Sequence, residues 1–179
     1  MRIGIDVSQL AFEKTGVSNY LENLLLSLVK NKNYEFILFY SSMRRKIPDS
    51  IKKILNSNSN VILKNYKFPP FILDILWNKL HKIPIENFIG KVDFFITSDW
   101  TEPPVKKARK ATILYDLIVY KYPKETAKKI VDVQKNKLYW VKKESDIVFC
   151  ISDSTRKDAL EILKLDKEKT KVLYPGLTV

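Results

Sequence analysis

The sequence predicts an α/β domain: a Rossmann-like, mostly parallel sheet with helices on both faces. Three observations favour this fold. Short apolar runs alternate along the chain with segments of helical spacing, which is the pattern of strands joined by helical crossovers. The first apolar run, 2–7, is typical of a strand buried on both faces. The 179 residues, 45% hydrophobic and 12% aromatic, are enough for one well-buried domain and short for two.

The individual elements follow from local spacing. Residues 2–7 form the first strand and 8–15 a loop, after which apolar side chains recur every three or four positions from Val17 to Leu28. This spacing predicts a helix from Gly16 to near Asn31. The same alternation predicts further strands at 34–40, 60–66, 92–97, 111–115, 146–151 and 171–174, and further helices at 48–55, 71–80, 124–144 and 153–163.

Composition excludes several classes of chemistry. Cys150 is the only cysteine, so a disulfide scaffold and a cysteine-based zinc site are ruled out. His81 is the only histidine, which excludes catalysis by paired histidines and the usual histidine-rich metal sites. We therefore expect no bound metal. Cys150 lies within an apolar strand and is expected to be buried, whereas His81 has no partner motif and is expected at the surface.

The chain is strongly basic, with 32 Lys and Arg residues against 20 Asp and Glu and a formal charge of +12. Such a surface attracts nucleic acid, acidic lipid headgroups or phosphorylated metabolites, although the lysine richness equally fits a compositional bias of the source. The basic stretches 44–46, 52–53 and 106–110 are either solvated faces or a patch for a membrane surface or an acidic acceptor. No nucleic-acid partner is expected, because no known binding module accompanies the charge.

No apolar run approaches the roughly 20 residues needed to span a bilayer, and the chain enters its first strand without an export signal. We therefore expect a cytoplasmic protein whose basic surface allows peripheral contact with the inner face of an anionic membrane.

Ligands of parallel α/β sheets bind beyond the carboxyl ends of the strands, so the loops that follow the strands at 2–7, 92–97, 111–115 and 146–151 should share one crevice. The first of these loops leads into Thr15, Gly16, Val17 and Ser18. Free amides at a helix start, a glycine and neighbouring hydroxyls suit a phosphate. The alternative is that Thr15 caps the helix and Gly16 only permits the turn.

Acidic and aromatic side chains follow a later strand of the same sheet. Tyr115 and Asp116 end the strand at 111–115, and Tyr120 lies in the loop beyond it. A carboxylate beside aromatic faces suits recognition of a ligand hydroxyl, as sugars require. The alternative is that Asp116 caps the following turn and the tyrosines pack beneath it.

Two further loops hold candidate acceptor-binding residues. Asp99, Trp100 and Glu102 follow the strand at 92–97, and either contact an acceptor or form a solvated turn. Ser152 opens the helix at 153–163, where it either caps that helix or offers its hydroxyl to a ligand in the crevice.

Taken in order, these segments resemble the N-terminal domain of glycosyltransferases of the GT-B fold, in particular the retaining glycosyltransferase family four. Ile-Gly-Ile-Asp followed by Thr-Gly-Val and a tyrosine is similar to that family's opening strand and turn, and Asp116-Leu117 with a later Tyr-Pro is similar to its His-Asp-Leu segment. The remaining segments that carry the resemblance are 146–152, Ser154, Asp158 and 171–176.

The resemblance implies that residues 1–174 form the acceptor side of a cleft and that 175–179 begin an interdomain linker. It also implies that the nucleotide-sugar donor binds mainly to a C-terminal domain, absent here, which supplies paired glutamates and lies in the same chain or in a partner subunit. This segment alone is therefore expected to lack robust transferase activity. The acceptor would be a glycan, a lipid or a similar molecule, and no metal or other cofactor is implied.

By the same resemblance Asp116 and Tyr115 hold the catalytic positions, while Thr15 to Ser18 face the donor phosphates. Tyr115 stands where the family usually has histidine, and its unperturbed pKa of about 10 makes it a hydrogen-bond donor rather than a base at neutral pH. Ser18 and Asn19 replace a glycine and a basic residue. Two other functions remain open: a free-standing binding module or partner subunit that completes a transferase in trans, and a nucleic-acid-binding α/β domain.

Overall fold

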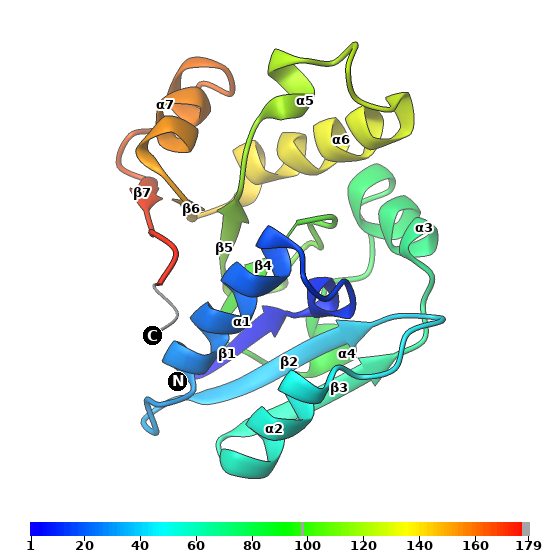
Figure 1. The fold of residues 1–179 in the computed structure, drawn as a ribbon, viewed down its shortest axis with the longest axis vertical. Helices are drawn as coiled ribbons and strands as arrows, with labels where there is room; N and C mark the ends of the chain where they lie inside the picture. Colours follow the sequence, from blue (N-terminus) through cyan, green and yellow to red (C-terminus); the bar gives the residue numbers. More distant parts are fainter. Residues whose placement is uncertain (98, 177–179) are drawn as a thin grey trace.

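A seven-stranded parallel sheet in the order β3-β2-β1-β4-β5-β6-β7 forms the centre of the protein, in a computed structural model that describes residues 1–97 and 99–176 (Figure 1). The predicted α/β class with a parallel sheet is confirmed. The strands are β1 (Arg2–Asp6), β2 (Glu35–Ser41), β3 (Val61–Tyr66), β4 (Phe94–Thr97), β5 (Arg109–Leu114), β6 (Ile147–Cys150) and β7 (Thr170–Val172).

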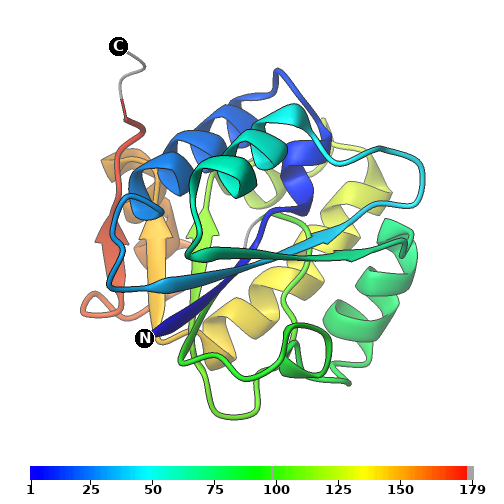
Figure 2. The same cartoon turned by 90° about the horizontal axis from the view of Figure 1, so that it is seen from below.

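Helices cover both faces of the sheet, as the sequence predicts. In Figure 2, α1 and α2 lie on one side of the sheet, with α3, α4 and α6 on the other. The helical segments are η1 (Ser8–Ala11), α1 (Gly16–Leu28), α2 (Asp49–Ser57), α3 (Pro70–Leu73), η2 (Asp74–Lys79), α4 (Glu86–Ile89), α5 (Ile118–Lys121), α6 (Lys128–Glu144) and α7 (Asp153–Glu161).

Strand β2 shows why two helical layers are needed. Phe36, Leu38 and Tyr40 pack in the core beneath α1 and α2, whereas Ile37 and Phe39 pack in the core on the opposite face, beside η2 and α4. All five are almost completely buried. Successive side chains of a strand point to opposite faces, so a continuous apolar run can only be buried between two layers.

The order of the strands reverses between β1 and β4. From β1 the chain proceeds outward through β2 and β3, then returns to place β4 on the other side of β1 and proceeds outward again to β7. The crossovers that leave β1 and β4 therefore diverge, and a crevice opens beyond the carboxyl ends of these strands. This edge of the sheet is where a ligand site is expected.

Two predicted helices differ from those observed. The helix expected at 71–80 is a short α3 followed by a π-helical turn, η2, in which the Leu80 amide donates to the Ile75 carbonyl at 2.9 Å. The helix expected at 124–144 begins at Lys128, and a separate short α5 precedes it. Pro123 explains why α5 ends at Lys121, because the residue before a proline is driven out of helical geometry. Short helices η1 and α4 were not predicted.

The predictions for the single cysteine and the single histidine have different outcomes. Cys150 is buried as predicted, and burial raises the pKa of its thiol to about 12, so the thiol stays protonated. The prediction that His81 lies at the surface is wrong. Its side chain is only 8% exposed, because the ring stacks on Trp140 and both ring nitrogens meet oxygen atoms.

Among residues 1–97 and 99–176, none of the helices has the length and apolarity to cross a membrane. The predicted linker 175–179 lies partly outside the described residues, since 177–179 are not described. Pro175 and Gly176 follow β7 without regular structure.

Candidate functional site

A cavity of about 210 Å³ lies where β4 and β5 end, between the start of α1 and the helix α6. We call it the site cavity. Five residues predicted from the sequence line it, namely Val17, Asp99, Trp100, Tyr115 and Asp116. The structure thus brings together side chains from three loops that are far apart in the chain.

Asp99 is held at the cavity by α6. Gln134 donates from Nε2 to the Asp99 carbonyl at 3.1 Å and to Asp99 Oδ1 at 3.4 Å. Burial raises the pKa of Asp99, the charge of Asp116 acts in the same direction, and Lys137 opposes both. A carboxylate with a raised pKa is a better proton acceptor than an ordinary aspartate.

Asp116 is exposed and shapes the next turn. Its Oδ1 accepts a hydrogen bond from the Ile118 amide at 3.0 Å, just before α5. This contact is the capping role that the sequence leaves open as an alternative. It occupies one carboxylate oxygen; within the described part of the chain Oδ2 makes no hydrogen bond, so it is available to a ligand in the cavity.

Tyr115 is largely buried beneath this turn. Its residue is 8% exposed, and the ring meets the Tyr20 ring edge-on, with centroids 5.6 Å apart. The Tyr115 carbonyl accepts a hydrogen bond from Thr155 Oγ1 at 2.9 Å, which ties β5 to α7. Packing against Tyr20 is therefore a large part of what Tyr115 does, and only part of its surface reaches the cavity.

The first loop has the geometry of a capped helix. Thr15 Oγ1 accepts a hydrogen bond from the Ser18 amide at 3.1 Å, as an N-cap residue does. Ser18 is 3% exposed, so its hydroxyl is withdrawn from the surface position expected for a phosphate contact. Gly16 is exposed, and a Cβ added there would meet nothing within 4 Å. Of the four predicted phosphate-facing residues, only Val17 lines the site cavity.

Three other predicted residues lie away from this cavity. Glu102 is fully buried, and Ser152 caps α7 by accepting from the Thr155 amide. Tyr120 lines a separate hollow beside Lys135, whose Nζ lies 5.4 Å from the centre of the tyrosine ring.

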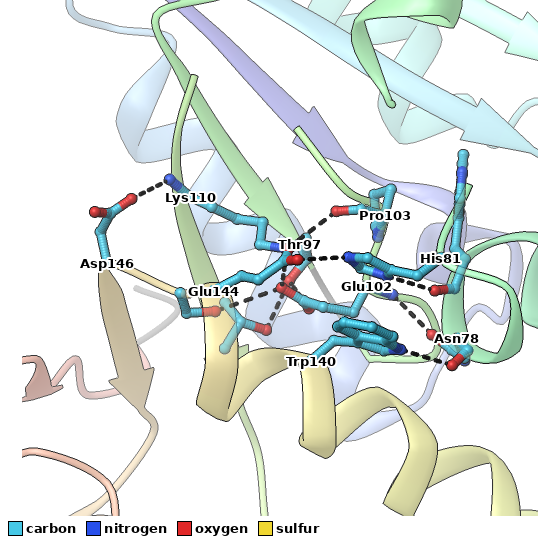
Figure 3. Close-up of polar contacts among 12 residues, drawn as sticks. Asn78, His81, Thr97, Glu102, Pro103, Lys110, Trp140, Glu144 and Asp146 are labelled. Carbon is cyan, nitrogen blue, oxygen red and sulfur yellow. Dashed lines mark hydrogen bonds and ion pairs between the residues drawn. The ribbon is translucent and has the colours of Figure 1, made fainter. Parts of the chain in front are cut away.

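Glu102 belongs to a buried polar network beneath the site (Figure 3). Its carboxylate accepts a hydrogen bond from Thr97 Oγ1 at 2.6 Å and lies 3.4 Å from Lys110 Nζ. Lys110 in turn donates to Glu144 at 2.7 Å and to the Pro103 carbonyl at 3.1 Å. The network fixes the loop after β4 against α6, which makes Glu102 a positioning residue for Asp99 and Trp100 rather than a ligand contact.

The sequence analysis did not single out the two polar residues that α6 contributes to the site cavity. Gln134 and Lys137 both line it, and Lys137 is 2% exposed. Burial lowers the pKa of Lys137, while Glu102, Asp99 and Asp6 oppose this shift. A signal was present, because both residues fall on the stripe of α6 defined by the buried Val131, Leu138 and Val141.

Only two carboxylates line the site cavity, and in the described portion of the chain no group of three or more His, Cys, Asp or Glu residues is placed to hold a metal ion. Its charged groups are instead two acids that face the cavity and one buried lysine behind them.

The fold and the position of this crevice define a class: the chain has the Rossmann-like α/β fold found in glycosyltransferases of the GT-B architecture. Among solved structures, the chain is similar to UGT2 of Phytolacca americana. Its apo structure aligns with a TM-score of 0.52 and 11% identity over 98% of this chain and 52% of that one. Its complex with UDP-2-fluoro-glucose and pterostilbene aligns with a TM-score of 0.52 and 10% identity over 98% and 53%. The chain therefore spans about half the length of these structures. No family model and no curated protein sequence matches it.

Proposed function

We propose that this chain is the acceptor-binding half of a nucleotide-sugar-dependent glycosyltransferase. The observation that supports this most strongly is that Asp99 and Asp116, from the ends of two adjacent strands, face one cavity beside Trp100 and the start of α1. Carboxylates next to an indole ring are suited to bind and orient a hydroxyl-bearing acceptor. The likeness to half of UGT2 supports the fold that such a role needs.

In this proposal the acceptor hydroxyl donates to Asp99 or to the unoccupied oxygen of Asp116. The raised pKa of Asp99 favours partial transfer of the hydroxyl proton as the glycosidic bond forms. The Tyr115 ring packs against Tyr20 at the same edge of the sheet. The donor binds chiefly to a second domain, in the same chain or in a partner subunit, and its phosphates approach the exposed amide edge at Gly16.

The retaining outcome and the membership of family four are part of the same proposal. Both rest on the resemblance of the segments that contain Asp6, Gly16 and Asp116. A cytoplasmic protein that contacts an anionic membrane through its basic surface would suit a lipid-linked acceptor.

The test uses the natural full-length chain, purified with any partner that accompanies it. It is incubated with UDP-glucose or GDP-mannose and an extract of small molecules and lipids from the same cells, and release of the nucleoside diphosphate is measured. We expect acceptor-dependent release that persists in a metal chelator. Absence of release with a broader panel of nucleotide-sugars would overturn the proposal, and steeply salt-dependent binding of an oligonucleotide instead would favour the nucleic-acid alternative.

A further inference from the structure

A second cavity, of about 310 Å³, lies beside the site cavity at the ends of β1 and β2. We call it the apolar cavity. Its apolar lining comes from η1 and its following turn, from α3, and from α6, with the side chains of Phe12, Phe71, Leu73, Trp100, Ile130 and Val133. A volume near 300 Å³ is at the lower end of the range for pockets that bind small molecules, about 300–1,000 Å³.

Aromatic side chains frame the entrance. Phe71 is 57% exposed and Phe12 is 40% exposed, although both line the cavity. Phe12 is held in place from outside, since the Arg45 guanidinium lies 4.6 Å from the centre of its ring and donates to the Ala11 carbonyl at 3.0 Å. Exposed rings at the mouth of a hollow are surfaces that an apolar ligand would cover.

Gln9 presents a polar group to the apolar cavity. Gln9 is 7% exposed and lines the cavity, but within the described residues its side-chain amide makes no hydrogen bond. Its polar neighbours are satisfied: Asp6 accepts from the Ser8 amide, and Ser41 Oγ both donates to and accepts from the Phe68 backbone. The polar atoms of this amide are accessible, since Gln9 is not among the fully buried unpartnered groups, so the amide can donate to or accept from a polar atom of a ligand.

The two cavities share lining residues. Trp100 and Ile130 line both, so a molecule in the apolar cavity would lie against the indole that also borders Asp99 and Asp116. A ligand with an apolar body and polar groups at separate positions could therefore occupy the apolar cavity and present a hydroxyl to the site cavity.

From this arrangement we infer that the apolar cavity binds the body of the acceptor, and that the acceptor is an aromatic alcohol rather than a hydrophilic sugar. The inference rests on the proposed function. The aromatic rings of Phe12, Phe71 and Trp100 favour a ring over an alkyl chain, because ring pairs gain from edge-on and offset stacking. The Gln9 amide binds a second polar substituent of the acceptor.

The experiment measures binding of 2-naphthol, naphthalene and n-decanol to the natural full-length protein by calorimetry, without donor. We expect 2-naphthol to bind more tightly than the other two. Val133→Trp, which fills the cavity from α6, should weaken 2-naphthol binding at least tenfold. Asn136→Trp is the matched control on the same helix, since Asn136 lines a different hollow, and it should bind as wild type does.

Two further variants keep the inference testable if Val133→Trp folds poorly. Phe71→Ser changes an exposed side chain and should also weaken 2-naphthol binding. 2,6-Dihydroxynaphthalene has a hydroxyl for each position, so Gln9→Leu should weaken its binding about two- to tenfold and leave naphthalene binding unchanged, as expected for the loss of one hydrogen bond. Wild-type binding in folded Val133→Trp and Phe71→Ser, or tighter binding of n-decanol than of 2-naphthol, would overturn the inference.

The two proposals fail in different ways. If 2-naphthol binds and Val133→Trp prevents it, but the protein transfers sugar to no acceptor, the proposed function fails. If Val133→Trp transfers sugar to a hydrophilic acceptor at the wild-type rate, the aromatic acceptor is wrong and the transferase assignment stands.

Discussion

The His81 ring stacks directly on the Trp140 indole, with ring centroids 3.6 Å apart and planes inclined by 7°. The histidine is held at both nitrogens: Nδ1 lies 2.8 Å from the Trp77 carbonyl and Nε2 lies 2.9 Å from Glu144 Oε1. Both ring nitrogens therefore face oxygen atoms of the protein. The segment after η2 is thereby fastened to the C-terminal end of α6 (Figure 3).

Replacing His81 by asparagine should destabilise the fold by about 2 kcal/mol, through loss of the ring stack and of the hydrogen bond to Glu144. Asparagine is the informative choice because His81 has φ of 50°, a conformation that asparagine tolerates. Urea denaturation measures the effect. Lys82→Ala, at the exposed neighbouring position, is the control, and equal stability of the two variants would contradict the structural role of the ring.

Glu144, in the same cluster, should make the folded protein less stable at acid pH. Partial burial acts to raise the pKa of Glu144, but hydrogen bonds from Lys110 and His81 outweigh it and hold the pKa below its ordinary value of 4.5. A depressed pKa in the folded state contributes stability that is present above pH 4.5 and is lost as the pH falls through the folded pKa. Glu144→Gln should therefore be less stable than wild type at pH 7, with the difference shrinking below pH 4.5. A difference independent of pH would contradict this.

The fold was predictable because it depends on local signals. Alternating apolar runs and helical stripes predict the strands, and the run in β2 requires cover on both faces, as observed for Phe36 and Ile37. The predictions from sequence fail where tertiary packing determines the structure. Nothing local to the single histidine indicates that Trp140, 59 positions later, will lie against it.

The site was predictable only in part, for the same reason. Parallel strands end at one edge of a sheet, so Asp99 and Asp116 were expected to converge. Which residues of α6 face that edge depends on how the helix is rotated and placed on the sheet, and this rotation brings Gln134 and Lys137 into the cavity. The same packing withdraws Glu102 into the core, where Lys110 and Thr97 hold it.

Asp99→Asn should raise stability at pH 7 and lower sugar transfer. Burial raises the pKa of Asp99 above its ordinary value of 3.8. Ionisation of this carboxyl therefore costs more in the folded state than in the unfolded state, and the free energy of unfolding falls as the pH rises above 3.8. Asparagine removes this penalty and keeps the oxygen that accepts from Gln134. Thermal unfolding should show a higher Tm for the variant at pH 7 and none of this gain below pH 3.8, where the carboxyl is protonated in both states. A lower Tm at pH 7 would contradict it.

Asp116→Asn should leave the fold intact and reduce kcat for transfer about 10²-fold, the scale of a lost acid–base or charge contact at a reacting hydroxyl. The residue is exposed, and asparagine retains a side-chain oxygen that can accept from the Ile118 amide. Steady-state kinetics of the full-length enzyme measures the effect. Asp132→Asn, at an exposed position of α6, is the matched control, and wild-type kinetics in Asp116→Asn would remove this residue from the catalytic site.

Alanine substitutions at two glycines should affect stability differently. A Cβ on Gly4 would lie 2.7 Å from both Ile89 Cδ1 and Phe95 Cδ2, in the centre of the sheet, so Gly4→Ala should cost about 1–3 kcal/mol by overpacking. Gly16 has open space for a Cβ at the first position of α1, so Gly16→Ala should be neutral or slightly stabilising.

The kinetic effect of Gly16→Ala then decides between the two roles of this glycine. If donor phosphates approach the amide edge of α1, the added methyl group should raise KM for the nucleotide-sugar with no loss of stability. An unchanged KM in this stable variant would mean that Gly16 serves only the turn after Thr15, and the donor-facing role of the first loop would be withdrawn.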